Sequence, residues 1–223
     1  QNNMIGACLM AHPQLVADCV KAMQDATSLD VTVKHRIGID DQDSYEEMRD
    51  FVGTVADTGC KTFIVHARKA ILSGLSPKEN REIPPLRYED VFRLKREFPG
   101  LEIIINGGIT THDQIAELLT QVDGVMLGRE AYHNPSILME ADQRYFSSDA
   151  PITGKGDAIR SLYPYIETLL AEGAPLHYVS RHTLGLFNGE RGSRLYRRHL
   201  SENAYKRESG TEVMEQALAY VGY

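Results

Sequence analysis

Three strand-like runs of this sequence carry, at or near their ends, a polar side chain that could take part in chemistry: Lys34, His66 and Asn106. Alternate residues of a strand point to the same face of a sheet, and in (β/α)8 barrels the functional site lies at the carboxyl ends of the strands. We therefore predict that these three side chains converge at one end of a parallel sheet. The pattern alone would also be produced by a lysine that reaches solvent at Lys34 and by a satisfied core histidine at His66.

Two glycine-containing turns follow the last two strand-like runs. One is Asn106-Gly107-Gly108 and the other is Gly128-Arg129. Glycine permits a positive φ and lets backbone amides approach a phosphate closely. The loops after the last two strands are also a common phosphate site of barrels, where Arg129 would add a planar charged donor. The turns therefore predict a phosphorylated cofactor, although a tight turn and a surface arginine would give the same pattern.

The elements that position these residues alternate between strand-like and helical patterns through residues 1–150. The expected strands are 31–36, 62–66, 101–106 and 124–127, and the expected helices are 13–27, 44–58, 88–98 and 111–121. Ser44 with Glu47, and Thr111 with Gln114, form capping boxes that predict where two of the helices begin. Alternation at this spacing indicates βα units and an α/β fold with a parallel sheet.

Residues 67–87 form a long connection with no helical period. Loops of this length in compact domains are usually functional or disordered. The segment contains Arg68, Lys69, Lys78 and Arg81. We therefore expect a functional, positively charged loop over the mouth of a barrel.

From Pro151 onward the alternation stops, and after a linker at 153–156 the patterns are helical at 157–172, 176–187 and 193–205. We predict a first domain over 1–150 and an all-α domain over 151–223. The net charge of the chain is −7, but residues 181–208 contain seven Arg or Lys against three Glu. This local excess of about +4 can mark a surface that faces a polyanion. Arg194, Arg197 and Arg198 lie at helical spacing within it, which in general is more often a solvated face than an RNA site.

Composition excludes several other classes of protein. Cys8, Cys19 and Cys60 are too few and too scattered for a metal cluster, no C-x-x-C occurs, and we predict no metal site. No apolar stretch approaches the roughly 18 to 20 residues that a membrane span needs. We expect a cytoplasmic protein whose sequence begins in the middle of a longer fold, because Gln1 is not an initiator methionine.

The order of the motifs carries a resemblance to a known family. K-H-R occurs at 34–36, H-A-R-K at 66–69, N-G-G-I at 106–109 and L-G-R at 127–129. Together with the loop HARKAILSGLSPKENREIPPLRY and the tail RHTLGLFNGERGSRLYRRHLS, this order closely resembles the bacterial tRNA-dihydrouridine synthases of the A class. The resemblance covers essentially the entire chain.

The resemblance implies a TIM barrel that binds FMN at its mouth and uses NADPH to reduce D-loop uridines 20/20a of tRNA to dihydrouridine. The positions that match flavin-ring contacts are Lys34 and His66, and those that match the surroundings of the ribityl phosphate are Asn106, Gly107, Gly108, Gly128 and Arg129. Positions associated with tRNA contact are matched by Lys78, Arg81 and Arg197.

The sequence departs from the family pattern in three respects. The family's catalytic acid is a cysteine in a G-C-P loop, which none of the three cysteines matches, so no catalytic residue is expected here. Four strands cannot close an eight-stranded barrel, and we expect a C-terminal half barrel with impaired activity. Ile71 stands where the A class usually has tryptophan. The alternatives are an inactive remnant that still binds tRNA through its helical tail and another flavin oxidoreductase that acts on a small molecule; the oligomeric state stays open.

Overall fold

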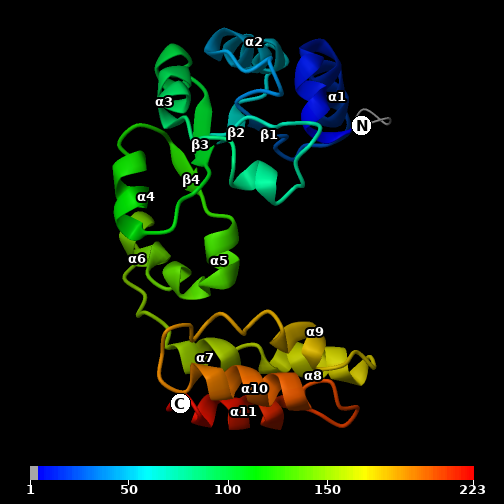
Figure 1. Cartoon of the computed structure of the whole chain (residues 1–223), viewed down its shortest axis with the longest axis vertical. Helices are drawn as coiled ribbons and strands as arrows, with labels where there is room; N and C mark the ends of the chain where they lie inside the picture. Colours follow the sequence, from blue (N-terminus) through cyan, green and yellow to red (C-terminus); the bar gives the residue numbers. More distant parts are fainter. Residues whose placement is uncertain (1–4) are drawn as a thin grey trace. The chain divides into compact units, whose positions relative to one another are not determined.

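A computed structural model of the protein describes residues 5–223. Packing divides the chain after Gly128 into two compact units, which are considered separately below. Figure 1 shows the strands in the first unit and the helices that follow it in the second.

The first unit contains a four-stranded sheet of β1 (Val33–Arg36), β2 (Thr62–His66), β3 (Glu102–Asn106) and β4 (Gly124–Met126). All neighbouring strands are parallel, and their order along the sheet is β1-β2-β3-β4. This confirms the predicted α/β class and the four predicted strands, each to within two residues at either end.

Side chains alternate between the two faces of this sheet. Phe63, Val65, Ile103 and Ile105 are fully buried, because one face packs against helices. Their neighbours in the strands are only partly buried and occupy the opposite face. The residues with chemistry are all on that second face, as the alternation predicts.

The helices of the first unit begin close to where the sequence predicts them. They are α1 (Pro13–Ala26), α2 (Tyr45–Ala56), α3 (Tyr88–Glu97) and α4 (His112–Leu118), preceded by a short 3₁₀ helix, η1 (Gly6–Ala11). Ser44 and Glu47 form a complete capping box at α2, and Thr111 and Gln114 form another at α4. Each box satisfies backbone N–H groups that the first turn of a helix leaves without acceptors.

The second unit is helical and begins with a helix at its first residue. They are α5 (Arg129–His133), η3 (Pro135–Leu138), α6 (Ala141–Tyr145), α7 (Lys155–Arg160), α8 (Tyr163–Ala171), α9 (His177–Ser180), α10 (Ser193–Asn203) and α11 (Thr211–Ala219). Its core contains Ile159, Ile166, Phe187, Tyr196 and Met214, all 2% exposed or less.

The boundary between the units falls earlier than the 150/151 division predicted from the end of the strand pattern. Asn188 donates its side-chain amide to the carbonyl oxygen of His133 at 2.8 Å, and the hydroxyl of Tyr132 lies 3.0 Å from Nδ1 of His182. These contacts attach α5 to the helices that follow it, which is why residue 129 already belongs to the second unit.

Two helical predictions differ from the structure. The helix expected over 157–172 is divided into α7 and α8, because Pro164 starts a new helix and cannot continue the old one. The helix expected over 176–187 is only four residues long, and Gly189, with a φ of 82°, ends the turns that follow it. Helix α11 was not predicted. No helix among the described residues is long and apolar enough to cross a membrane.

Candidate functional site

The structure brings Lys34, His66 and Asn106 together at the carboxyl edge of the sheet. Nζ of Lys34 donates a hydrogen bond of 3.1 Å to Oδ1 of Asn106, across two strand positions and 72 residues of chain. His66 pairs in register with Asn106 on β3 and with Arg36 on β1. The convergence of these three side chains is therefore confirmed as geometry, and Arg36 joins them.

The amine of Lys34 is held in an unusual electrostatic setting. Burial of the amine, and then the positive charge of Arg36, lower the pKa of Lys34 below that of a free lysine. Asn106 orients the amine, while its own amide nitrogen donates to the carbonyl oxygen of Met126 at 2.8 Å. One asparagine thus joins β1, β3 and β4 at the edge where the site lies.

Gly107 and Gly108 turn the chain away from β3 in conformations that other residues rarely adopt. Their φ angles are 125° and 69°. A Cβ at Gly107 would lie 2.9 Å from both Cδ2 of His66 and Cδ2 of Leu86, and one at Gly108 would lie 2.7 Å from Cδ1 of Leu86. The hydroxyl of Tyr88 donates to the carbonyl oxygen of Gly107. The positive φ favours glycine at both positions, and a Cβ at Gly107 would also press against His66.

The second glycine turn has a different character. Gly128 has no positive φ, and a Cβ there would meet nothing closer than Nδ2 of Asn106 at 3.9 Å. Close packing within the first unit does not require glycine at this position. Arg129 is exposed and opens α5 as the first residue of the second unit.

A cleft of about 470 Å³ lies beside β1 within the first unit. Its polar wall includes Lys34, Arg36 and His66, and apolar side chains such as Met10 and Phe51 line the remainder. A concave site with an apolar wall and a few convergent polar groups is typical of small-molecule sites.

His35, which sequence reasoning did not single out, is buried at the same cleft. It packs between Phe51 and Phe63, with ring centroids 5.2 Å and 6.1 Å away. Burial lowers the pKa of His35 to about 4. Its Nδ1 lies 2.6 Å from the carbonyl oxygen of Arg36 and must donate to it, so neutral His35 presents Nε2 as an acceptor with no donor among residues 5–223. The sequence offered one indication of this residue, a histidine between two cationic residues in a predicted strand.

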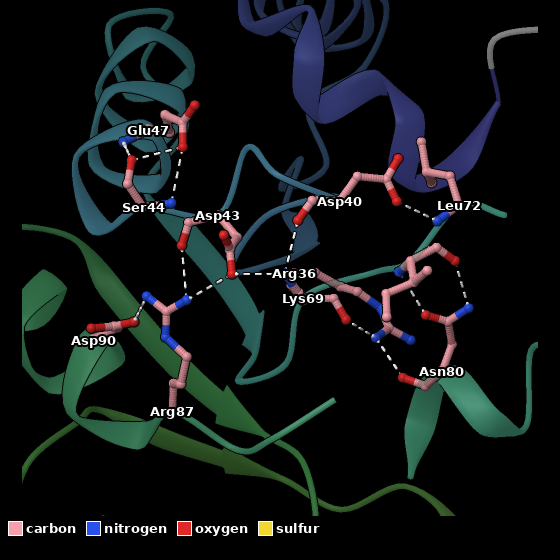
Figure 2. A network of polar contacts seen from close by, with 11 residues as sticks. Arg36, Asp40, Asp43, Ser44, Glu47, Lys69, Leu72, Asn80, Arg87 and Asp90 are labelled. Carbon is pink, nitrogen blue, oxygen red and sulfur yellow. Dashed lines mark hydrogen bonds and ion pairs between the residues drawn. The ribbon is translucent and has the colours of Figure 1, made fainter. Parts of the chain in front are cut away.

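The long loop 67–87, called the basic loop below, is held against residues 36–43 by a polar network (Figure 2). Arg36 donates from Nη1 to the carbonyl oxygens of Lys69 and Asn80, both at 2.8 Å. The side-chain amide of Asn80 in turn pairs with the backbone of Ile71, accepting from its N–H at 2.7 Å and donating to its carbonyl at 2.8 Å. A loop without helical period is therefore given a defined shape by side chain to backbone bonds.

The cationic residues of the basic loop predicted to contact RNA lie at η2 (Glu79–Arg81). Lys78 is the exposed residue that precedes this short 3₁₀ helix, and Arg81 is its exposed last residue. Burial, and then the charges of Arg81 and Arg68, lower the pKa of Arg36. The basic loop therefore gathers like charges near the site, where an anion would be stabilised.

In the second unit, α10 presents arginines on one side and apolar residues on the other. Arg194, Arg197 and Arg198 are exposed, whereas Tyr196 and Leu200 are buried in the helical core. Arg197 donates to Oδ1 of Asn188 at 2.8 Å, and Arg198 pairs with Glu202 at 2.8 Å. Helix α10 is therefore amphipathic, and the three arginines at helical spacing lie on its exposed face.

The three cysteines lie in different environments. Cys8 is partly buried, Cys19 is exposed on α1, and Cys60 is buried, which raises the pKa of its thiol. Within residues 5–223, no group of three or more His, Cys, Asp or Glu residues could hold a metal ion.

Comparison with known proteins adds an independent line of evidence. The sequence model of a family described as "Dihydrouridine synthase (Dus)" matches residues 1–221. The chain is 59% identical over 218 residues to the tRNA-dihydrouridine(20/20a) synthase of Pseudomonas putida, covering 98% of this chain and 65% of that protein. It is 57% identical over 222 residues to the enzyme of the same name from Yersinia pestis, covering 99% of this chain and 64% of that protein.

The chain thus spans about 65% of the length of these curated relatives. Among solved structures, a crystal structure of CdNal from Clostridium difficile matches 94% of this chain and 70% of its own chain, with 12% identity and a TM-score of 0.33. That likeness is too weak to bear on the fold.

Proposed function

Because the chain belongs to the dihydrouridine synthase family, we propose that it forms the C-terminal half of an FMN-dependent tRNA-dihydrouridine synthase. Its four parallel strands would be half of a (β/α)8 barrel, and residues 151–223 would form the tRNA-binding domain. The proposed substrate is uridine at positions 20/20a of tRNA, the positions that the names of its relatives specify, with NADPH as reductant.

The observation that carries this proposal is the hydrogen bond between Lys34 and Asn106 at the carboxyl edge of the sheet, with His66 beside it. FMN, when bound, supplies the hydride chemistry that the reduction of a uracil ring needs. Lys34 would stabilise negative charge on the ring system, and His66 would bind beside it. The cleft lined by both residues has apolar walls that suit a planar aromatic ring.

The residues after β3 and β4 fit a phosphate group. No backbone carbonyl within residues 5–223 accepts a hydrogen bond from the N–H of Gly107 or Gly108, although Gly107 is buried. A buried donor without a partner is costly, and a phosphate oxygen would satisfy it. Gly128 leaves room nearby, and Arg129 would add a charged donor.

Each unit, taken by itself, offers exposed cations to which tRNA would bind. Lys78 and Arg81 present their charges from η2 of the basic loop, and Arg197 presents its charge from α10. Contacts of this kind mostly bind phosphates and weaken as salt rises. The target uracil would have to leave its stack to enter the cleft, as in other enzymes that act on bases.

No catalytic acid is assigned in this chain. The sequence contains no Gly-Cys-Pro. Cys60 is buried with a raised thiol pKa, and Cys19 is exposed on α1; neither lines the cleft that contains Lys34 and His66. We therefore expect turnover to require residues outside this sequence.

Titration of the purified chain with FMN tests the cofactor proposal. Binding should quench flavin fluorescence and should weaken about tenfold in Lys34→Ala, since a charge-assisted contact is lost. Dihydrouridine should be absent after incubation with unmodified tRNA and NADPH, and should appear when the chain is extended at its N-terminus to the full length of its relatives. Failure of the extended protein to bind FMN would contradict the proposal.

A second candidate is tRNA binding without catalysis. One observation favours this candidate: α10, which bears the arginines, packs on the core of the second unit. The fold of α10 therefore does not depend on an intact barrel. Salt-sensitive tRNA binding by a chain that does not bind FMN would select this candidate.

A further inference from the structure

Asp40 has a strained backbone and holds the start of the basic loop with three groups. Its φ is 42°, in the left-handed region that residues other than glycine rarely adopt. Its N–H donates to the carbonyl of Ala70 at 2.8 Å. Its carbonyl accepts from Nζ of Lys69 at 2.9 Å, and its Oδ1 accepts from the N–H of Leu72 at 2.8 Å (Figure 2). Such strain persists where the surroundings determine the conformation, and it gathers at functional sites.

Asp43 acts on the same loop at both of its ends. Its Oδ2 lies 3.3 Å from Nζ of Lys69, near the start of the loop, and 3.1 Å from Nη1 of Arg87, at the end. Arg87 is also paired with Asp90 on α3 (Figure 2). The two cations are therefore engaged within the protein and serve to fix the loop.

The contacts continue from Asp40 to the part of the loop that carries Lys78. Asp40 fixes Leu72, the residue next to Ile71, and Ile71 is paired through its N–H and carbonyl with the side chain of Asn80 in η2. Lys78 precedes η2, is exposed, and forms no ion pair within residues 5–223. Lys69 and Lys78 thus differ: the amine of Lys69 is bound by Asp40 and Asp43, whereas Lys78 is exposed to solvent.

We propose that Asp40 is a positioning residue for tRNA: its backbone holds Lys69 and Ala70 and its carboxylate holds Leu72, so that Lys78, which precedes η2, is presented to a phosphate of the RNA backbone. This inference rests on the proposed function, because it takes tRNA as the ligand of the basic loop. It extends that function by assigning a role in RNA binding to an acidic residue.

The sign of the effect separates positioning from simple electrostatics. Removing a negative charge beside a polyanion site should strengthen RNA binding. If Asp40 positions the loop, loss of its carboxylate oxygen should weaken binding instead. Asp41, its exposed neighbour, has no side-chain hydrogen bond within the described residues and is a matched control for the change in charge.

Two substitutions at Asp40 keep the backbone conformation and differ in the acceptor. Glycine and asparagine both tolerate a positive φ, so neither forces the loop to refold. Asp40→Asn removes the charge but keeps an oxygen for the N–H of Leu72, whereas Asp40→Gly removes both. We expect tRNA affinity in Asp40→Asn and Asp41→Asn to equal or exceed that of the unsubstituted chain, and affinity in Asp40→Gly to fall about threefold, the size of one exposed ionic contact.

A double-mutant cycle with Lys78→Ala tests the route of the effect. Lys78→Ala should weaken tRNA binding about threefold in the unsubstituted chain, but should have little further effect in the Asp40→Gly background, since Lys78 is no longer held in place. Affinities would be measured by fluorescence anisotropy of labelled unmodified tRNA at two salt concentrations. Equal effects of Lys78→Ala in both backgrounds would overturn the proposal, as would unchanged or stronger binding by Asp40→Gly.

Amide hydrogen exchange keeps failure of this inference distinct from failure of the proposed function. Exchange over residues 69–82 should be faster in Asp40→Gly than in the unsubstituted chain, Asp40→Asn or Asp41→Gly. If the unsubstituted chain binds no tRNA, the proposed function is wrong, and the role of Asp40 in tRNA binding is overturned with it. If tRNA binds but exchange is uniform across the variants, the positioning role alone is overturned.

Discussion

Nζ of Lys34 and Oδ1 of Asn106 lie 3.1 Å apart, although β2 separates their strands in the sheet. The contact is possible because both side chains rise from the same face, and a lysine is long enough to cross the intervening strand. Burial and the charge of Arg36 lower the pKa of Lys34, and the hydrogen bond to Asn106 orients its amine. The pair therefore fixes a positive group at the edge where a cofactor would bind.

Replacement of Lys34 by alanine should weaken FMN binding about tenfold while the free energy of unfolding changes little, because the residue as a whole is exposed and only its amine is partly desolvated beside Asn106. The matched control is Lys61→Ala, since Lys61 is an exposed lysine that precedes the opposite end of β2. FMN affinity would be measured by fluorescence quenching and stability by urea denaturation. Equal loss of affinity in the two variants would contradict a specific role for Lys34.

Lys34 and Asn106 show how far the sequence predicts this site. Lys34 and Asn106 were predicted to share an edge because strand period alone fixes the face of each side chain. Their direct hydrogen bond was not predictable, since it depends on the strand order β1-β2-β3-β4 and on register, which no local pattern encodes. Residue types and faces are local properties, whereas distances between strands are not.

The shape of the basic loop and the last helix could not be predicted from local sequence. The absence of helical period correctly indicated a long loop, but its shape is set by Asp40 and Arg36, more than 25 residues away in sequence. Helix α11 was missed, although Val213, Met214, Ala217 and Leu218 are buried at helical spacing. Packing against Tyr196 and its neighbours decides that this segment is part of a core.

Substitution of Gly107 by alanine should destabilise the first unit by about 1 to 3 kcal/mol, since its φ of 125° is unfavourable for alanine and the added Cβ would lie 2.9 Å from Cδ2 of His66. Gly100→Ala is the control, because a Cβ there meets nothing within 4 Å and its φ is not positive. Urea denaturation compares the two. Similar stability of the two variants would show that the turn relaxes without cost.

Loss of Arg197 should weaken tRNA binding about threefold and reduce the slope of log affinity against log salt by about one, as expected for one phosphate contact. Arg198→Ala should have a smaller effect, because Arg198 is already paired with Glu202 at 2.8 Å on the same helix. Both arginines are exposed, so the variants should be equally stable. A larger effect of Arg198→Ala would assign the RNA-facing side of α10 to the other arginine.

His35 should make stability depend on pH in mildly acidic solution. Burial lowers its pKa from 6.5 to about 4 in the folded protein, so between these values the unfolded chain binds a proton that the folded chain does not. Stability is then complete above about pH 6.5 and is lost as pH falls toward 4, by an amount on the order of a few kcal/mol.

His35→Asn isolates this contribution, because asparagine does not titrate and its amide nitrogen can take the place of Nδ1 as donor to the carbonyl of Arg36. The variant should be less stable than the unsubstituted protein at pH 7.5, since it leaves a cavity beside Phe51 and Phe63. That difference should shrink as pH falls to 5. Protonation of His35 in the unfolded chain then destabilises the unsubstituted protein, whereas the asparagine variant has no such group to protonate. Urea denaturation at the two pH values measures it, and a constant difference would show that His35 keeps an ordinary pKa in the folded protein.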